Sequence, residues 1–416
     1  MTPRPRVVIS IFDDFDNPHY AGGGPVVVRT IADRLATGHD VLVVTGGRCF
    51  RRSRRGGVEH LHLPVTWLGP RGGQLLWALL LPLTAVCLRY DVWIESFTPP
   101  WSSNLVPLVT RRPVVGLAQS LSGRDMARRY RTRFPLKAER WLLRSYDDVV
   151  VLNASDREVV RECTTTTRVH LIPNAVEPPE QPAAGADDGR YALFLGRIDV
   201  GQKGLDLLLD AYAAGGEELL PLVIAGGGRK RDERELVERL EGFGARVRWV
   251  GPVHGEAKET LIAGSAFLVV PSREESFCLS ALEALARGRP VVHFDLPQLR
   301  WIPAAGSVAV PPFEVPRLRA AIALLSGDAS LRAAAGASAA RFAREYLARN
   351  TAAAYPDLVR QVLARGRPSR NVAPEPAGRA EPTGHASMPA AAAAAGEVDR
   401  CARRNAPSPP GGKMVP

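Results

Sequence analysis

Short apolar runs alternate with longer amphipathic segments along the first half of the 416-residue chain. Each run is rich in β-branched residues, and most are followed by enough sequence for a helix. The pattern predicts strands at 7–12, 40–45, 91–96, 113–119, 148–153 and 169–174. Strands that alternate with helices indicate a parallel sheet covered by helices on both faces.

The same pattern starts again after residue 190. Further strands are predicted at 191–196, 221–226, 247–251, 266–272 and 289–294. Residues 316–364 then have helical periodicity. The apolar positions of the first and last of these helices are Leu318, Ile322, Leu325, Tyr355, Leu358 and Val362.

The segment 177–190 is rich in Pro, Gly and Asp and predicts a linker. We therefore expect an α/β protein of two Rossmann-like, doubly wound parallel-sheet domains, 1–176 and 191–365, that face a cleft. The second domain includes the closing helices. The tail, 366–416, is dominated by Pro, Ala, Gly and Arg and is expected to be disordered.

The chain carries a net charge of +11, and arginine supplies nearly all of it. One basic segment contains Arg51, Arg52, Arg54 and Arg55, and a second contains Arg124, Arg128, Arg129, Arg131, Arg133, Lys137, Arg140 and Arg144. A positive field suits nucleic acid, an anionic membrane or a phosphorylated substrate, although charge runs are often only solvated surface. We expect no nucleic-acid partner, on the grounds that base-stacking aromatic residues do not accompany these arginines.

The five cysteines have no metal or CxxC spacing and fit a reducing cytoplasm. The N-terminal residues look like a first strand rather than a signal peptide. The apolar run 75–88 is shorter than the roughly 20 residues that span a bilayer. It predicts a core or interfacial helix, so the expected location is the cytoplasm, with peripheral binding to the inner face of the membrane as an added expectation.

The first candidate site follows the strand at 191–196. Gly196 ends the strand, Arg197 comes next, and Lys203 and Gly204 precede an amphipathic helix. Ligands bind at the carboxyl ends of parallel strands, and two cations beside a glycine turn suit a diphosphate. The alternative is a loop with solvated charges.

The second candidate site is the stretch VVPSREESFCLSALEALARGRPVV, residues 269–292. A strand leads into a loop and then a helix, whose N-terminus at residues 277–279 can hold a phosphate. Carboxylates accept paired hydrogen bonds from vicinal hydroxyls, so Glu275 and Glu283 could hold a sugar and a ribose. The alternative is helix capping, because Ser272 and Ser280 each precede one of these glutamates by three residues.

Acidic residues also follow the first strand, where the run Asp13-Asp14-Phe15-Asp16 contains a D-x-D pattern. Such a pattern can hold a divalent metal, but acidic residues at a strand end are more often solvated. The cations and the helix terminus already provide for phosphate charge, so we expect no catalytic metal. No good general base emerges near the two candidate sites.

These motifs resemble the retaining GT-B glycosyltransferases of family four (glycosyl transferases group 1). The resemblance covers roughly residues 5–365 and is carried by the Arg197/Lys203 pair with the E-x7-E element, supported by HLIPNAV at 170–176 and AGGG at 225–228. It implies that Arg197, Lys203 and Glu275 are catalytic. Arg197 and Lys203 would bind the donor diphosphate, Glu275 the transferred sugar, Glu283 the ribose, and Ser276, Phe277, Cys278 and Leu279 the donor phosphates.

The resemblance also assigns donor binding to Gly196 and to a glycine-rich loop with Gly22, Gly23 and Gly24. Three positions depart from the family pattern. Ser276 and Cys278 stand where glycines are usual, and Gln119 stands where a histidine usually faces the sugar. Gln119 can hydrogen-bond a sugar hydroxyl but cannot carry a proton.

The expected reaction is transfer of a sugar, with retention, from a UDP- or GDP-linked donor to a hydroxyl of a glycan, a lipid-linked or a small-molecule acceptor. The nucleotide sugar is a co-substrate, and no cofactor is expected. The acceptor would bind the N-terminal domain, whose arginines could attract an anionic membrane surface. A non-catalytic nucleotide-sugar-binding homologue and a GT-B phosphorylase or epimerase are the alternatives.

Overall fold

The computed structural model describes residues 4–14, 23–97, 105–178 and 189–366. The described residues up to Gly366 belong to one compact unit, which holds both sheets. Gly22, Asp16, residues 179–188 of the expected linker and the expected tail from residue 367 lie outside the described residues.

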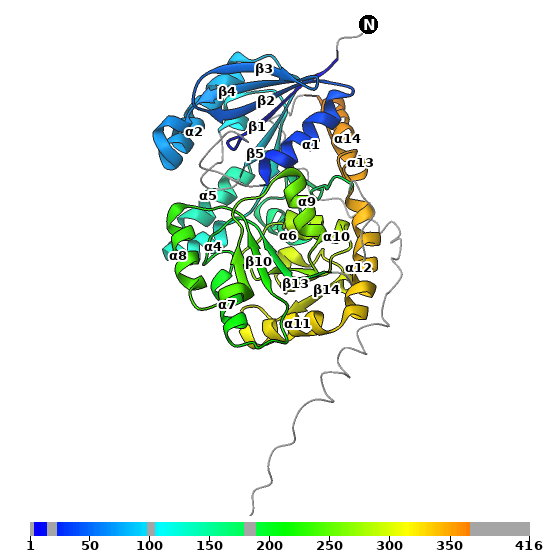
Figure 1. Ribbon diagram of the computed structural model, residues 1–416. Helices are drawn as coiled ribbons and strands as arrows, with labels where there is room; N and C mark the ends of the chain where they lie inside the picture. Colours follow the sequence, from blue (N-terminus) through cyan, green and yellow to red (C-terminus); the bar gives the residue numbers. More distant parts are fainter. Residues whose placement is uncertain (1–3, 15–22, 98–104, 179–188, 367–416) are drawn as a thin grey trace, which may run out of the picture. The chain divides into compact units, whose positions relative to one another are not determined.

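The first sheet has eight strands in the order β3-β4-β2-β1-β5-β6-β7-β8. Figure 1 labels β1 to β5 of this sheet. They are β1 Arg6–Ile11, β2 Asp40–Gly47, β3 Arg51–Arg55, β4 Val58–Pro64, β5 Val92–Phe97, β6 Val114–Ala118, β7 Asp148–Val151 and β8 Arg168–Leu171. All pairs are parallel except β3 with β4. The six strands predicted from the apolar runs are confirmed.

The hairpin of β3 and β4 was not predicted. Arg51, Arg52, Arg54 and Arg55 looked like a charge run, but they lie on β3, an exposed edge strand paired antiparallel with β4. A strand without apolar residues gives no period-two signal. Charged side chains on an edge strand discourage pairing with another chain, so this basic segment has a structural role.

Two helical layers cover the first sheet. On one face, β-strand residues such as Val7 and Ile9 pack with α1 (Gly24–Ala36) and α14 (Ala354–Arg365). On the other face, residues such as Val8 and Trp93 pack with α2 (Gly69–Cys87), α3 (Val106–Val109), α5 (Phe134–Leu143) and α6 (Ala154–Cys163). The alternation of neighbouring residues between the two cores is the period-two signature of a sheet buried on both sides.

The second sheet has six parallel strands in the order β11-β10-β9-β12-β13-β14. They are β9 Ala192–Leu195, β10 Leu222–Ala225, β11 Val247–Trp249, β12 Phe267–Val270, β13 Val291–Phe294 and β14 Ser307–Val310, of which only β14 was not predicted. Its helices are α7 Leu205–Ala213, α8 Lys230–Leu240, α9 Gly255–Ala263, α10 Leu279–Ala286, α11 Val315–Gly327 and α12 Ala329–Ala343. The chain leaves β9 toward β10 on one side and reaches β12 on the other, so the strand order reverses between β9 and β12.

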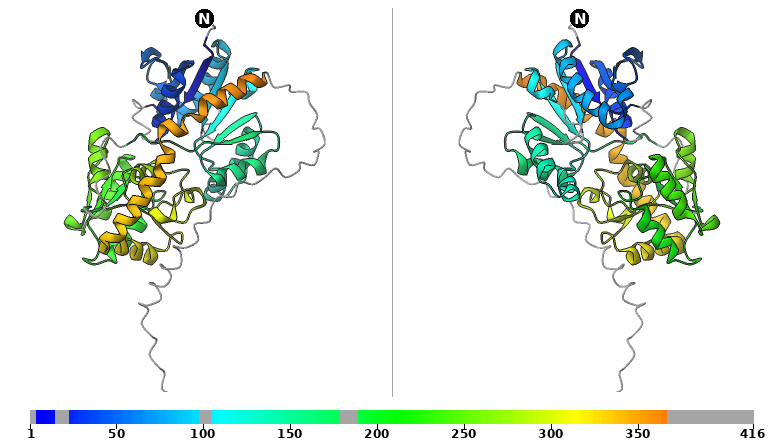
Figure 2. Two further views of the ribbon diagram at one scale, coloured as in Figure 1. Left: turned by 90° about the vertical axis from the view of Figure 1, so that its right-hand side faces the viewer. Right: turned by 90° about the vertical axis from the view of Figure 1, so that its left-hand side faces the viewer.

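The chain returns to the first sheet at its end, through α13 (Ala348–Thr351) and α14 (Figure 2). Tyr355, Leu358 and Val362 are buried, as the helical pattern predicted. Beyond them, Arg365 reaches Asp148 at the start of β7, at 3.2 Å from Nη1 to Oδ1. The last described helix is therefore anchored to the first sheet by an ion pair.

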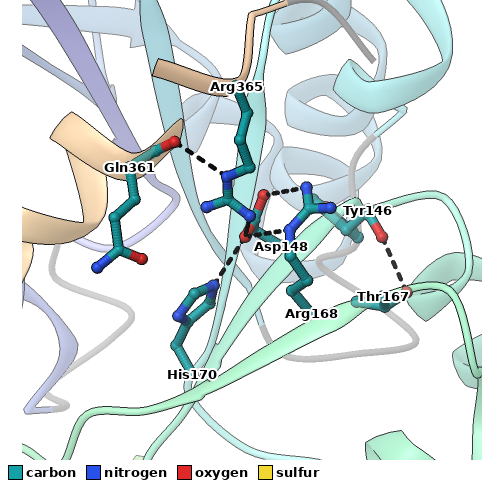
Figure 3. Close-up of polar contacts among 7 residues, drawn as sticks. All are labelled: Tyr146, Asp148, Thr167, Arg168, His170, Gln361 and Arg365. Carbon is teal, nitrogen blue, oxygen red and sulfur yellow. Dashed lines mark hydrogen bonds and ion pairs between the residues drawn. The ribbon is translucent and has the colours of Figure 1, made fainter. Parts of the chain in front are cut away.

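Asp148 collects three basic partners (Figure 3). Arg168 donates to both carboxylate oxygens at 3.1 and 2.9 Å, and His170 Nε2 lies 2.7 Å from Oδ1. Burial opposes ionisation, but the hydrogen bonds from His170 and Arg168 and the charges of Arg168 and Arg365 hold the pKa of Asp148 well below its usual value. The segment 170–176, which resembles the family pattern, therefore begins with a histidine whose side chain bonds Asp148 within the first sheet.

Gly204 joins the two loops at the strand-order reversal of the second sheet. Its φ is +66°, and a Cβ added there would lie 1.8 Å from the carbonyl oxygen of Pro271. Only glycine combines the left-handed backbone with so close an approach. The glycine after Lys203 is therefore required by packing between the β9 and β12 loops.

We predict that Gly204→Ala destabilises the protein by at least about 1–2 kcal/mol, the cost of a left-handed alanine before any clash is counted. Denaturant unfolding measures the change. Gly201→Ala is the matched control, since a Cβ at Gly201 meets nothing within 4 Å. Equal stability of the two variants would contradict this account of the turn.

Candidate functional site

Two loops meet at the carboxyl ends of the neighbouring strands β9 and β12. Arg273 in the second loop donates from its backbone N to the carbonyl of Gln202 at 2.9 Å and from its side chain to the carbonyl of Gly201 at 2.7 Å. It also forms a bidentate pair with Asp206 of α7, both distances being 2.7 Å. The loops are fixed to each other at the point where the strand order reverses, which is where open α/β sheets bind ligands.

Lys203 and Glu275 form an ion pair across these loops. Lys203 Nζ lies 2.5 Å from Glu275 Oε1, and Ser272 Oγ donates to the same oxygen at 2.8 Å. The side chain of Glu275 is only 8% exposed and that of Lys203 20%. Burial is the largest influence and disfavours the ammonium, but the charge and hydrogen bond of Glu275, together with the nearby Cys278, outweigh it and raise the pKa of Lys203. The lysine is thus fully ionised at neutral pH.

Arg197 is the exposed member of the predicted cation pair. Its Nη2 donates to Gln202 Oε1 at 2.9 Å, and Gln202 Nε2 lies 3.4 Å from Glu274 Oε2. Gln202 therefore links Arg197 to Glu274, for which the sequence suggested no role. Gly196 precedes Arg197 at the end of β9, and a Cβ there would make only ordinary contact with Phe194. Its backbone N donates to the carbonyl of Ala225 of β10 at 3.0 Å.

The α10 helix begins at Leu279, directly after the Glu275 loop. Its N-cap, Cys278, has φ +63° and makes no side-chain cap. The N–H of Ala281 donates to the carbonyl of Cys278 at 3.1 Å, so within the described residues the N–H groups of Leu279 and Ser280 remain for an anion. Phe277 is buried and stacks on Trp301 with ring centroids 4.4 Å apart, and its carbonyl accepts from Trp301 Nε1 at 2.9 Å. This packing holds the helix start in place.

The backbone at Cys278 accounts for the glycine that the family pattern has there. A positive φ is strained for a residue with a Cβ and natural for glycine. The Cys278 side chain is buried, and burial, together with the nearby charge of Glu275, raises its pKa to about 12. The thiol is therefore protonated and not a nucleophile at neutral pH.

Both helix-capping interpretations are wrong. Ser272 bonds the side chain of Glu275, and no helix begins there. Ser280 lies inside α10. Glu283 instead pairs with Lys258 of α9, with Nζ 2.7 Å from Oε1. The two glutamates of the E-x7-E element each have a lysine partner.

Two N-cap residues of helices that cover the first sheet, Gly23 of α1 and Asn153 of α6, lie close to the start of α10. A Cβ on Gly23 would lie 2.3 Å from Leu279 Cδ1, and Asn153 Nδ2 donates to the carbonyl of Ser276 at 2.7 Å. Gly24 is the first residue of α1. Gln119 does not take part in this arrangement through any contact within the described residues; its Nε2 donates to Ser96 Oγ at 3.1 Å, within the first sheet.

The D-x-D pattern does not assemble a metal site in the part of the chain that the structure describes. Asp14 accepts from Thr45 Oγ1 at 2.6 Å and lies 3.2 Å from His62 Nδ1. Among the described residues, no group of three or more His, Cys, Asp or Glu side chains could hold a metal ion. Asp16, the third member of the pattern, lies outside the described residues.

The sequence reasoning overlooked Lys258, Trp301 and Asp13. Lys258 is one of only five lysines in a chain whose cations are mostly arginines, as is Lys203. Trp301 carried no local signal, because it meets Phe277 only through the fold. Asp13 was considered only as a metal ligand, whereas burial raises its pKa to about 6 against the opposing charge of Arg197.

Asp13 predicts a pH dependence of stability. Its folded-state pKa lies above the unfolded value of 3.8, so ionising Asp13 costs the folded protein more than the unfolded chain. The wild type should therefore lose stability relative to Asp13→Asn as pH rises from about 4 through 6, by about 1–3 kcal/mol at pH 7. Denaturant unfolding at several pH values measures this difference. Asp33→Asn, at an exposed carboxylate, is the matched control. If the difference in stability between the wild type and Asp13→Asn stays constant across pH, the assignment is refuted.

Both halves of the chain match known families. Residues 21–179 match the family described as Glycosyltransferase Family 4, and residues 189–328 match Glycosyl transferases group 1. A phosphatidyl-myo-inositol mannosyltransferase of Mycobacterium leprae is 34% identical over 161 residues, 37% of this chain and 42% of the relative. An alpha-D-kanosaminyltransferase of Streptomyces kanamyceticus is 31% identical over 153 residues, 36% of this chain and 39% of the relative. The aligned part spans less than half of these relatives.

Solved structures share the fold. A sucrose-phosphate synthase from Thermosynechococcus elongatus has a TM-score of 0.75 at 22% identity and covers 87% of this chain and 100% of its own. Anabaena HepE in complex with UDP and glucose has a TM-score of 0.67 at 16% identity, over 86% of this chain and 100% of its own. Among the residues that the structure describes, no helix is both long enough and apolar enough to cross a membrane.

The family matches to both halves and the GT-B fold together show that this chain belongs to the family-four glycosyltransferases, glycosyl transferases group 1.

Proposed function

We propose that the protein transfers a hexosyl group, with retention and without a metal ion, from a UDP- or GDP-linked sugar to a hydroxyl acceptor. The observation that carries this proposal is the buried Lys203–Glu275 pair at the β9/β12 reversal, beside an uncapped helix start. A cation, a carboxylate and free N–H groups together match the diphosphate and hydroxyls of a nucleotide sugar.

The donor diphosphate lies against Lys203, Arg197 and the N-terminus of α10. Lys203 is a fixed point charge, because its nitrogen is already held by Glu275. Arg197 is exposed and, among the described residues, donates a hydrogen bond to Gln202, so it can turn toward a second phosphate. The dipole of α10 adds partial positive charge from the opposite side. Ser276, Phe277, Cys278 and Leu279 supply the backbone there.

The two glutamates hold the two ends of the donor. Glu275 uses carboxylate oxygen left over from Lys203 and Ser272 to accept from hydroxyls of the transferred sugar. Glu283, one turn into α10, accepts from the ribose while Lys258 orients it. The backbone of residues 277–279 lies between them in sequence and takes the diphosphate.

Catalysis in this proposal is mainly electrostatic. Negative charge develops on the leaving nucleoside diphosphate, and Lys203 and Arg197 are already placed to stabilise it. The acceptor hydroxyl attacks the anomeric carbon from the face that the diphosphate leaves. Because the attack comes from that face, the bond from the anomeric carbon to the diphosphate is replaced by a new bond of the same configuration. The proton of the acceptor hydroxyl passes to a departing phosphate oxygen. No protein base is required.

The relatives support a hexosyl donor. The names of those reported above include a mannosyltransferase and a kanosaminyltransferase, and one structure with the fold contains UDP and glucose. The three alternatives give different outcomes. A phosphorylase releases a sugar phosphate, and an epimerase leaves the nucleotide attached to an altered sugar, whereas a non-catalytic homologue binds donor and releases nothing.

A donor screen tests the proposal. Thermal-shift measurements with UDP- and GDP-sugars identify the donor, and released nucleoside diphosphate is then followed with candidate acceptors. We expect Lys203→Ala to lower kcat/KM by about 10²–10³-fold, the usual loss when one preorganised charge is removed. Lys230→Ala, on the exposed start of α8, is the matched control and should leave kcat/KM unchanged.

The assignment of Lys203 fails if Lys203→Ala, shown by its melting curve to be folded, turns over donor as fast as the wild type. A sugar phosphate product would favour a phosphorylase, and donor binding without turnover by the wild type would favour a binding protein.

Metal independence makes a separate prediction. Because Lys203, Arg197 and the α10 N-terminus provide the positive charge, transfer should continue at an unchanged rate in excess EDTA. The measurement is initial rate with and without EDTA, followed by Mn²⁺ addition. Activity abolished by EDTA and restored by Mn²⁺ would instead assign the donor phosphates to a metal.

A further inference from the structure

The outer side of α2 exposes an unusual amount of apolar surface. Trp77, Leu81 and Ala85 face the core of the first sheet. The opposite side carries Leu75, Leu79, Leu83 and Val86, which are 66%, 58%, 63% and 64% exposed. These four residues are spaced by four, four and three, so they form one stripe along the helix. Trp67, 67% exposed, lies just before the helix.

This apolar stripe continues onto α3, which packs against α2. Leu105, Leu108 and Val109 are partly exposed there. Scattered exposed leucines need no explanation, but a contiguous group of large apolar side chains marks a surface that binds something. We call the α2 and α3 residues the leucine stripe: Trp67, Leu75, Leu79, Leu83, Val86, Leu105, Leu108 and Val109.

A second group lies on α4 (Gly123–Tyr130) and α5. Tyr130, Phe134 and Trp141 are each more than half exposed, so the expectation that aromatic residues do not accompany these arginines was wrong. On α5, Phe134, Lys137 and Trp141 share one face because they are three and four residues apart. We call this the aromatic-basic face; its members are Tyr130, Arg131, Arg133, Phe134, Lys137, Arg140 and Trp141.

The leucine stripe and the aromatic-basic face belong to the same layer of the protein. The inner sides of α2, α3 and α5 all pack into one core on one face of the first sheet, so their outer sides all lie on that side of the sheet, away from the core. Figure 1 labels α2 and α5 beside this sheet. The two groups therefore form the outward surface of one helical layer.

The charge of this surface has a single sign over much of its length. Residues 60–90 contain no Asp or Glu, and neither do residues 96–124. Within the described parts of α5, Glu139 is buried and accepts from the backbone N of Gly123 at 2.8 Å, so it does not face outward. Apolar and aromatic side chains beside Lys and Arg, with little acid, match the interface of an anionic bilayer.

We infer that the outer surface of the α2, α3 and α5 layer docks the protein on an anionic lipid membrane. The leucine stripe enters the boundary between headgroups and acyl chains, and the aromatic-basic face lies at the level of the phosphates. The structure thus gives the expected membrane partner a specific surface. The arginines of β3 are not needed for it, because they serve a strand edge. The inference does not depend on the donor site or on glycosyl transfer.

Vesicle flotation of the full chain, without any donor, tests this inference. One set of vesicles is phosphatidylcholine alone and the other contains about 30% phosphatidylglycerol, which provides the anionic surface. We expect binding to the second set, weakened by added salt, and little binding to the first. Leu79→Glu with Leu83→Glu should weaken binding at least about tenfold, because two leucines no longer enter the bilayer.

Charge reversal of Arg133 and Lys137 should weaken binding to the anionic vesicles at least about fivefold, since each basic residue contributes near such a surface. Val237→Glu with Leu324→Glu is the matched apolar control, because these residues are also exposed but lie on α8 and α11. Lys230→Glu with Arg231→Glu, at the start of α8, is the charge control. Neither control should alter binding, and melting curves verify that every variant is folded.

A fluorescent label on Cys87 reports directly whether the end of α2 enters the bilayer. Cys87 is exposed at the end of α2, directly after Val86. Cys163 and Cys278 are buried, so changing Cys49 and Cys401 to Ser directs the label to Cys87. An environment-sensitive fluorophore there should shift to the blue on anionic vesicles. An unchanged spectrum, or equal binding by the wild type and the Leu79/Leu83 variant, would overturn the inference.

Other occupants of the surface give different results. If a second copy of the chain covers it, light scattering without vesicles shows a dimer that Leu79→Glu dissociates, and the wild type binds vesicles no better than the variant with Leu79→Glu and Leu83→Glu. Binding of a nucleic-acid probe in place of vesicles, lost on charge reversal of Arg133 and Lys137, would likewise overturn the membrane assignment. Loss of vesicle binding leaves donor thermal shifts unaffected, so failure of this inference is distinct from failure of the proposed function.

Discussion

The ion pair of Lys203 and Glu275 is the constraint on which the candidate site depends. Both side chains are largely shielded from water, and removing one partner of a buried pair leaves an uncompensated charge. The pair also joins the loop after β9 to the loop after β12. Holding a charged pair at a strand-order reversal gives a positive group of fixed position where the fold opens to a ligand.

The surrounding contacts all serve that geometry. Gly204 lets the first loop touch the carbonyl of Pro271, and Arg273 ties the second loop to Gly201 and Asp206. Trp301 fixes the residue before the uncapped helix start. A site in which the charges are already in place needs little reorganisation when negative charge develops on a leaving group. The same rigidity explains how a strained, non-glycine residue can stand at Cys278.

Much of the fold could be predicted from the sequence, because β-branched runs and helical stretches alternate strictly. The β3–β4 hairpin escaped prediction since four arginines leave no apolar period, and β14 is short and only partly buried. The serine–glutamate spacing suggested caps, but a local pattern cannot show that Ser280 lies inside a helix and that Glu283 meets Lys258 of another one. Likewise α2 is apolar all round, so only the structure separates its buried residues from its exposed leucines.

The proposed membrane surface and the proposed donor site lie on different parts of the fold, one on the outer side of a helical layer and one at the strand ends of the second sheet. The account's central claim is that Lys203 receives the donor diphosphate. With only five lysines, selective ¹³C labelling of lysine resolves each ammonium-bearing side chain by NMR. On titration with UDP or GDP, the account predicts that the Lys203 signal moves most, Lys258 follows when ribose reaches Glu283, and Lys137 and Lys230 stay unchanged. A nucleotide that binds but leaves the Lys203 signal where it was would contradict the account.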